Sequence, residues 1–128
     1  MNAEILCVGT ELLLGNIVNT DAAYLSEALA GLGINVYYHS VVGDNPDRLK
    51  KALAIALDRS DLVITTGGLG PTYDDLTKET IAQYFDLPLE VHADSLTQIK
   101  HFFAQHTEKM MANYEKHVLM PQGAAVFA

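Results

Sequence analysis

A stretch rich in glycine and threonine, which also carries two adjacent carboxylates, has the clearest chemical potential in the sequence. It covers residues 65–77 and reads Thr-Thr-Gly-Gly-Leu-Gly-Pro-Thr-Tyr-Asp-Asp-Leu-Thr. Glycine lets the backbone come close to a ligand and turn its N–H groups toward an anion, and the helix expected to follow offers its positive end. The pattern predicts a phosphate-binding loop whose contacts are Gly67, Gly68, Gly70, Thr72 and Thr77.

The two adjacent aspartates of this loop indicate a metal ion. Asp74 and Asp75 would repel a bare phosphate, whereas a bridging divalent cation such as Mg²⁺ prefers oxygen ligands of this kind. The loop is not a Walker A loop, because no lysine follows the glycines, and it lacks the G-x-G-x-x-G spacing of dinucleotide-binding folds. A plain glycine turn capped by aspartate is the alternative, but such a turn requires neither two aspartates nor several threonines.

Polar residues also follow the first two apolar runs of the chain. Thr10, Glu11 and Asn19 come after the first run, and Asp44 comes after the second. Thr10 and Glu11 could line a nucleotide pocket, whereas Asn19 could also serve merely as a helix cap. Asp44 could hold a cation or a water molecule, or it could interact with the dipole of the helix that follows.

Strand-like runs alternate with helical patterns along the sequence. The expected strands cover residues 3–8, 35–42 and 62–65, and the expected helices cover 20–32, a segment from 46, 75–85, 93–106 and 109–117. This alternation predicts an α/β fold with a mostly parallel sheet and helices on both faces. Ligands of such sheets bind beyond the carboxyl ends of the strands, so the three polar segments should meet there. We expect catalytic or metal-binding roles for Asp75, first of all, and for Asp44 and Asp74.

The composition limits the classes of function. The chain has 128 residues, is 49% hydrophobic and carries a formal net charge of −8, which indicates an ordered domain of ordinary size. Such an acidic chain is poorly suited to nucleic acid, and no apolar run is long enough for a membrane span. With a single cysteine, Cys7, in an apolar run and no signal peptide, we expect a cytoplasmic protein.

The remaining titratable side chains show no pattern of a site. The five histidines lack metal-ligand spacing and are expected to be solvated or structural; they are His39, His92, His101, His106 and His117. Solvated helix faces are expected to carry Lys100, Lys109 and Lys116.

Two motifs together resemble the N-terminal domain of the CinA family. They are Gly9-Thr10-Glu11-Leu12-Leu13 with Gly15-x-Ile17-x-Asn19-Thr20, and Gly67-Gly68-Leu69-Gly70-Pro71-Thr72-x-Asp74-Asp75-x-Thr77. The match extends from residue 5 to about residue 121. The family belongs to the molybdopterin-binding-like superfamily of the MogA and MoeA proteins, so the resemblance implies a three-layer α/β/α fold, with residues 1–128 as one domain.

The resemblance also implies an activity. CinA-type N-terminal domains look like metal-dependent pyrophosphatases that convert ADP-ribose to AMP and ribose 5-phosphate, whereas the MogA branch adenylylates molybdopterin. In the MogA pattern the loop aspartate falls on Asp75 and the aspartate after the second strand falls on Asp44. That branch commonly has arginine where this sequence has Asp74, which favours the CinA-type site. Asp21 stands where CinA relatives usually have asparagine, and it adds a carboxylate.

Two other kinds of function stay open at this point. The chain could hold a nucleotide or pterin without chemistry, or it could serve oligomer assembly, since superfamily relatives form dimers and trimers. We expect a homo-oligomer with a small phosphorylated ligand as its partner. The family's Gly-Thr-Ala-Pro-Gly segment and its C-terminal amidase domain are not in the sequence, so we expect a chain truncated at its C-terminal end.

Overall fold

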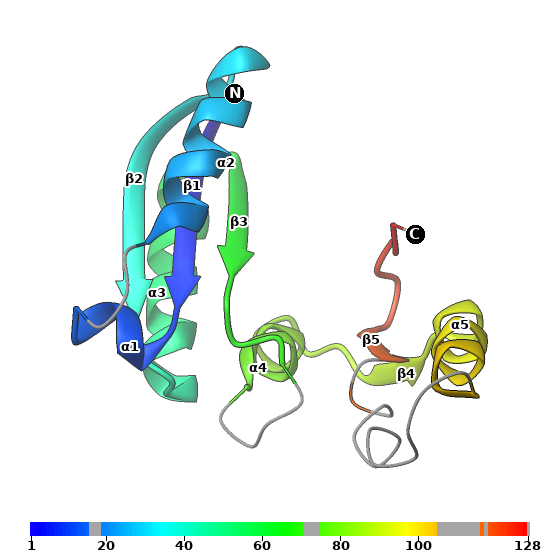
Figure 1. The fold of residues 1–128 in the computed structure, drawn as a ribbon. Helices are drawn as coiled ribbons and strands as arrows, with labels where there is room; N and C mark the ends of the chain where they lie inside the picture. Colours follow the sequence, from blue (N-terminus) through cyan, green and yellow to red (C-terminus); the bar gives the residue numbers. More distant parts are fainter. Residues whose placement is uncertain (16–18, 71–74, 105–115, 117, 128) are drawn as a thin grey trace.

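A computed structural model describes residues 1–15, 19–70, 75–104, 116 and 118–127 (Figure 1). Its helices and strands follow one another in the order expected for an α/β protein. In chain order they are β1 (Asn2–Val8), α1 (Thr10–Leu13), α2 (Thr20–Gly31), β2 (Asn35–Val42), α3 (Pro46–Arg59), β3 (Leu62–Thr66), α4 (Thr77–Tyr84), β4 (Leu89–Val91), α5 (Ala93–Ala104) and β5 (Leu119–Pro121). No helix in the described part of the chain is long and apolar enough to cross a membrane.

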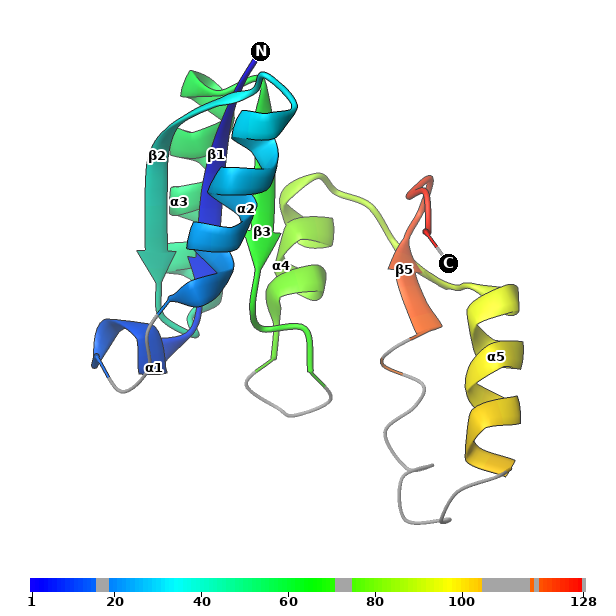
Figure 2. The same cartoon turned by 45° about the horizontal axis from the view of Figure 1, so that its top comes forward.

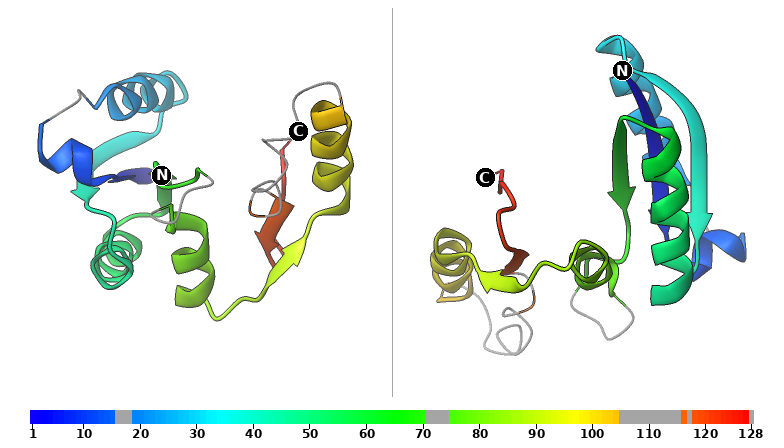
Figure 3. Two further views of the ribbon diagram at one scale, coloured as in Figure 1. Left: turned by 60° about the horizontal axis from the view of Figure 1, so that its bottom comes forward. Right: turned by 180° about the vertical axis from the view of Figure 1, so that it is seen from behind.

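The first three strands form a parallel sheet in the order β2-β1-β3. Helix α2 covers one face of this sheet and α3 covers the other, as the front and rear views show (Figures 1 and 3). The predicted three-layer α/β/α arrangement with a parallel sheet is therefore confirmed. All three strands end at the same edge, where α1 and the turn before α4 also lie (Figure 1).

The central strand β1 is buried on both faces, as its apolar run predicts. Ile5 and Cys7 pack with Leu29 of α2 on one face, while Leu6 and Val8 pack with leucines of α3 on the other. Successive side chains of a strand point to opposite faces, so one short strand contributes to two cores. Cys7 is buried in this core, as its place in the apolar run predicts.

The chain then leaves the parallel sheet through α4. This helix packs beside α3 and contacts β5. Strands β4 and β5 form a separate antiparallel pair, and α5 lies next to them, to the side of the parallel sheet (Figure 2). Almost all of the helix expected over 109–117 lies outside the described residues.

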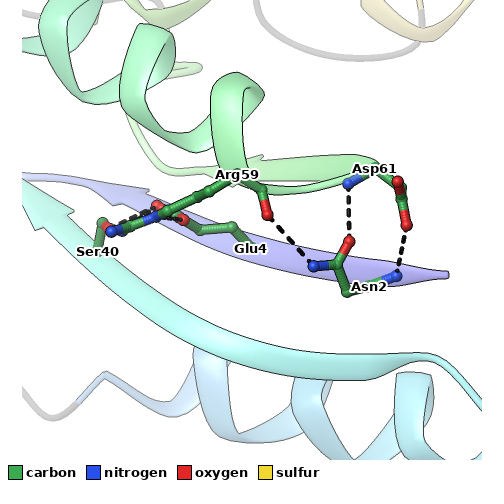
Figure 4. A network of polar contacts seen from close by, with 5 residues as sticks. All are labelled: Asn2, Glu4, Ser40, Arg59 and Asp61. Atoms are coloured by element: carbon green, nitrogen blue, oxygen red, sulfur yellow. Dashed lines mark hydrogen bonds and ion pairs between the residues drawn. The ribbon is translucent and has the colours of Figure 1, made fainter.

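A buried carboxylate interrupts the apolar run of β1. Glu4 is fully buried, and its carboxylate accepts hydrogen bonds from Arg59 Nε at 2.7 Å, Arg59 Nη2 at 3.2 Å and Ser40 Oγ at 2.7 Å (Figure 4). The Arg59 guanidinium also stacks on the ring of Tyr38, 3.6 Å from the ring centroid. Beside this group Asn2 and Asp61 exchange two backbone-to-side-chain hydrogen bonds of 2.9 Å, which ties β1 to the start of β3.

We expect Glu4→Gln to lower the free energy of unfolding at pH 7 by about 1.5–3 kcal/mol, the range for hydrogen bonds to charged groups. Burial alone would raise the pKa of Glu4, but the hydrogen bonds from Arg59 and Ser40 and the Arg59 charge outweigh it and lower that pKa below 4.5. The contribution of Glu4 is therefore complete above pH 4.5 and is lost as the pH falls through the lowered pKa.

Urea unfolding at pH 7 and at acidic pH measures this effect. The difference between wild type and Glu4→Gln should shrink as the solution is acidified. The matched control is Glu90→Gln, because Glu90 is an exposed carboxylate on β4. A difference that stays constant with pH, or that equals the one for Glu90→Gln, would contradict a stabilising charge at Glu4.

Candidate functional site

The glycine turn after β3 packs directly on the end of β1. Gly67 and Gly68 both have left-handed backbone angles, with φ of +87° and +65°. A Cβ atom at Gly67 would overlap the carbonyl oxygen of Val8, and one at Gly68 would overlap the hydroxyl of Thr77. The turn therefore requires glycine at both positions, for the backbone angle and for the close approach.

Thr77, the first residue of α4, stabilises this turn with two hydrogen bonds. Its hydroxyl is buried and donates to the Gly67 carbonyl at 2.8 Å, while its backbone N–H donates to the Gly68 carbonyl at 3.1 Å. Thr77 had been predicted as a phosphate contact; its buried, bonded hydroxyl instead indicates that it supports the turn.

Asp75 lies against the last glycine of the loop. A Cβ atom at Gly70 would be 2.6 Å from Asp75 Oδ2, so the absence of a side chain at Gly70 gives the carboxylate its room. The predicted contact Thr72 and the predicted ligand Asp74 lie outside the described residues.

The first two polar segments are joined by a reciprocal pair of hydrogen bonds. The backbone N–H of Thr10 donates to Asp44 Oδ2 at 3.3 Å, and the backbone N–H of Asp44 donates to Thr10 Oγ1 at 3.1 Å. Asp44 thus ties the loop after β2 to the start of α1. These two hydrogen bonds restrict the orientation of the Asp44 carboxylate as a metal ligand, although its Oδ1 atom takes part in neither of them.

A cavity of about 120 Å³ opens between the ends of β1 and β3. It is lined by Val8, Glu11, Leu12, Asn19, Thr20, Asp21, Thr66 and Gly67. Asn19 caps α2 through a 3.4 Å bond from the Ala22 N–H, and it also donates to Cys7 Sγ at 3.2 Å. Thr66 donates to Asp21 Oδ2 at 3.1 Å, which brings a second carboxylate beside Glu11 in this cavity. We call it the acidic cavity.

A second cavity, of about 290 Å³, lies on the other side of the glycine turn. Its lining consists of Gly68, Leu69, Asp75, Lys78, Glu79, Lys116 and Met120, and we call it the lysine cavity. Asp75 lines this cavity, whereas Asp44 lines neither of the two. Among the described residues, no group of three or more His, Cys, Asp or Glu side chains could hold a metal ion.

The prediction that Lys116 lies on a solvated helix face is wrong. Lys116 is only partly exposed, and its ammonium donates to the backbone carbonyl of Asp75. Lys78, which the sequence pattern did not single out, donates in turn to the backbone carbonyl of Lys116. These contacts join residues 38 and 41 positions apart, so no local spacing could have revealed them.

Two of the histidines have local structural roles, as expected. His39 shares a 2.7 Å hydrogen bond with Ser26 of α2, and His92 accepts the Ser95 N–H at 3.2 Å at the start of α5. Lys100 is exposed on α5, as expected.

Residues 4–128 match the family described as "Probable molybdopterin binding domain". The chain belongs to this family. Among curated proteins, a competence-damage inducible protein of Acetivibrio thermocellus is 59% identical and a CinA-like protein of a Cyanothece species is 58% identical; each match covers 98% of this chain. The chain spans about 30% of the length of these relatives.

Solved structures agree with this assignment. The CinA protein of Thermoplasma acidophilum, described as having unknown function, superposes with a TM-score of 0.84 at 37% identity, over 94% of this chain and 70% of that one. The tungsten cofactor synthesizing protein MoaB of Pyrococcus furiosus gives 0.62 at 25% identity, over 91% and 68% of the two chains. Within its family, the chain is therefore a CinA-type N-terminal domain.

Proposed function

We propose that the loops at the carboxyl edge of the parallel sheet form a metal-dependent nucleotide pyrophosphatase site, which hydrolyses ADP-ribose to AMP and ribose 5-phosphate. The observation that carries this proposal is the glycine turn, fixed between Val8 and Thr77, with the Asp75 carboxylate at its far end. A fixed turn keeps its backbone donors in place for phosphate oxygens before the ligand arrives.

The reaction needs a water molecule and neutralised phosphate charge. Water adds to one phosphorus atom, the bridging P–O bond breaks, and the two fragments separate as phosphate monoesters. The water's protons pass to the departing oxygen and to solvent. In this proposal the Gly67, Gly68 and Gly70 backbone binds the phosphates, and Asp75 orients the water or holds a cation. Thr10, Glu11 and Asn19 remain candidates for the nucleotide end.

The described donor set fits a cation that bridges protein and substrate. Mg²⁺ is usually held by one or two carboxylates together with substrate phosphates and water, and it does not need an all-protein cage. Asp75 beside the loop meets that requirement among the described residues, and Asp44 and Asp74 stay further candidates from the sequence. When bound, the cation would neutralise phosphate charge and lower the pKa of a coordinated water.

Binding without hydrolysis is the second candidate function. The family description favours it, since it refers to a pterin ligand rather than to a reaction. In that case the same cavities would hold a nucleotide or pterin, and the carboxylates would act only in recognition.

Release of AMP from ADP-ribose, measured with Mg²⁺ and with EDTA, separates the two. We expect AMP only in the presence of the cation, with the full-length Cyanothece relative run alongside. Isothermal titration calorimetry on the same samples records binding. Binding of ADP-ribose without AMP release would reject the hydrolase and support the binding role, and the absence of both would reject ADP-ribose as the ligand.

A further inference from the structure

Two lysine side chains meet in the lysine cavity beside the glycine turn, although they come from α4 and from a segment just before β5. Lys78 and Lys116 both line this cavity, together with Gly68 and Leu69 of the loop and the carboxylates Asp75 and Glu79. The volume of the lysine cavity, about 290 Å³, is near the lower end of the range for small-molecule sites, roughly 300–1,000 Å³. A small charged group therefore fits the space better than a whole dinucleotide.

The Lys78 ammonium has capacity for a ligand. It has three N–H donors, and it donates one hydrogen bond to the neutral backbone carbonyl of Lys116. Burial lowers the pKa of Lys78 below its usual range; the Glu79 carboxylate opposes this shift and the Lys116 charge adds to it. Phosphate oxygens are suitable acceptors for the remaining N–H groups of this half-buried ammonium, and the charge of Lys116 on the same cavity favours an anion there, against the Asp75 and Glu79 carboxylates of the lining.

Glu79 gives the cavity a second chemical requirement. It lines the same cavity, and its Oε2 atom is buried without a hydrogen-bond partner among the described residues. A buried acceptor without a donor is costly, so a ligand that brings a hydroxyl group would complete it. An anion for Lys78 and a hydroxyl donor for Glu79 are both supplied by a phosphate group that lies next to sugar hydroxyls.

We propose that the lysine cavity is a subsite for a sugar phosphate, with Lys78 and Lys116 contacting the phosphate and Glu79 accepting from a sugar hydroxyl. The glycine turn separates this subsite from the acidic cavity, which Glu11 and Asp21 help to line. The inference deepens the proposed function, because it assigns the ribose 5-phosphate half of the substrate to one side of the turn.

Binding of ribose 5-phosphate by calorimetry, in the absence of turnover, tests the subsite. We expect Lys78→Gln to weaken binding about 10- to 100-fold, the equivalent of one charge-assisted hydrogen bond. Lys78→Arg keeps the charge and should largely restore binding. The matched control is Lys100→Gln, since Lys100 is exposed on α5 and the change in net charge is the same. Thermal unfolding of each variant reports whether the fold is retained.

Three probes distinguish the chemistry of the ligand. Ribose should not bind, inorganic phosphate should bind weakly with the same dependence on Lys78, and ribose 5-phosphate should bind more tightly than phosphate. Glu79→Gln should reduce the advantage of ribose 5-phosphate over phosphate.

The outcomes separate this inference from the hydrolase. Equal affinity of folded Lys78→Gln, Lys100→Gln and wild type for ribose 5-phosphate would overturn the subsite, even if AMP release persists. No binding of phosphate or ribose 5-phosphate to wild type would overturn it as well. Binding that depends on Lys78 would support it even if ADP-ribose is not hydrolysed.

Discussion

Replacing Gly67 with alanine is expected to destabilise the protein by roughly 2–5 kcal/mol and to remove ligand binding at the turn. About 1–2 kcal/mol comes from placing a side chain on a left-handed residue, and about 1–3 kcal/mol comes from overpacking. The overpacking is severe because the obstacle is the Val8 carbonyl, a backbone atom of the central strand, and not a side chain that could rotate away.

Gly33→Ala separates the conformational cost from the cost of overpacking. Gly33 has a similar backbone angle, φ +76°, but nothing lies within 4 Å of the position where its Cβ would be. It should therefore cost only the conformational part, about 1–2 kcal/mol. Urea unfolding of both variants gives the comparison. Equal losses at the two positions would mean that the turn tolerates a side chain against β1, and the fixed turn would then be a poor argument for a phosphate site.

The core of the fold follows from patterns that act within one element. A nearly continuous apolar run is long enough to specify a strand buried on both faces, and β1 contains one that only Glu4 interrupts. Asn45 before Pro46 specifies the start of α3, where Asn45 accepts the Arg48 N–H at 3.0 Å. Such signals depend on neighbours in the chain, so the sequence alone is sufficient for them.

The start of α4 shows where local rules end. Aspartates are good helix caps, and the sequence predicts a helix that begins near Asp74 or Asp75; α4 instead begins at Thr77, and no side chain caps it. The glycine turn satisfies one backbone donor at the start of this helix, since the Gly68 carbonyl accepts the Thr77 N–H. The spacing of Ile81, Ala82 and Phe85 predicts that all three lie on the inner face of this helix, but the helix ends at Tyr84 and Phe85 is 49% exposed.

Leu32 illustrates the same limit at the end of α2. The spacing of Leu25, Leu29 and Leu32 predicts one buried stripe on the helix expected over 20–32, but α2 ends at Gly31 and Leu32 is 75% exposed. Partners from distant segments are harder still to predict. The Glu4–Arg59 pair spans 55 positions, and the contact between Lys116 and Asp75 spans 41. Candidate residues for the site could be named from the sequence, whereas their neighbours in space depend on the packing of whole elements.

For the proposed hydrolase, Asp75→Asn should keep the fold and lower metal-dependent turnover of ADP-ribose by about 100-fold or more. A cation or an oriented water contributes several kcal/mol at the transition state, and each 1.4 kcal/mol is a factor of ten in rate. The substitution is nearly isosteric, so the space beside Gly70 can accept it. Lys116 donates to the backbone carbonyl of Asp75, and the substitution leaves that hydrogen bond in place.

Asp94→Asn is the matched control, because Asp94 is an exposed aspartate on α5 and loses the same charge. AMP release is measured over a series of Mg²⁺ concentrations for both variants. If Asp75 holds the cation, its variant should need more Mg²⁺ for half-maximal rate; if it orients the water, the rate should stay low at every concentration. Unchanged turnover in a folded Asp75→Asn protein would remove Asp75 from the mechanism and leave Asp44 and Asp74 as the carboxylates to test, because a pyrophosphate charge must still be neutralised somewhere on this edge of the sheet.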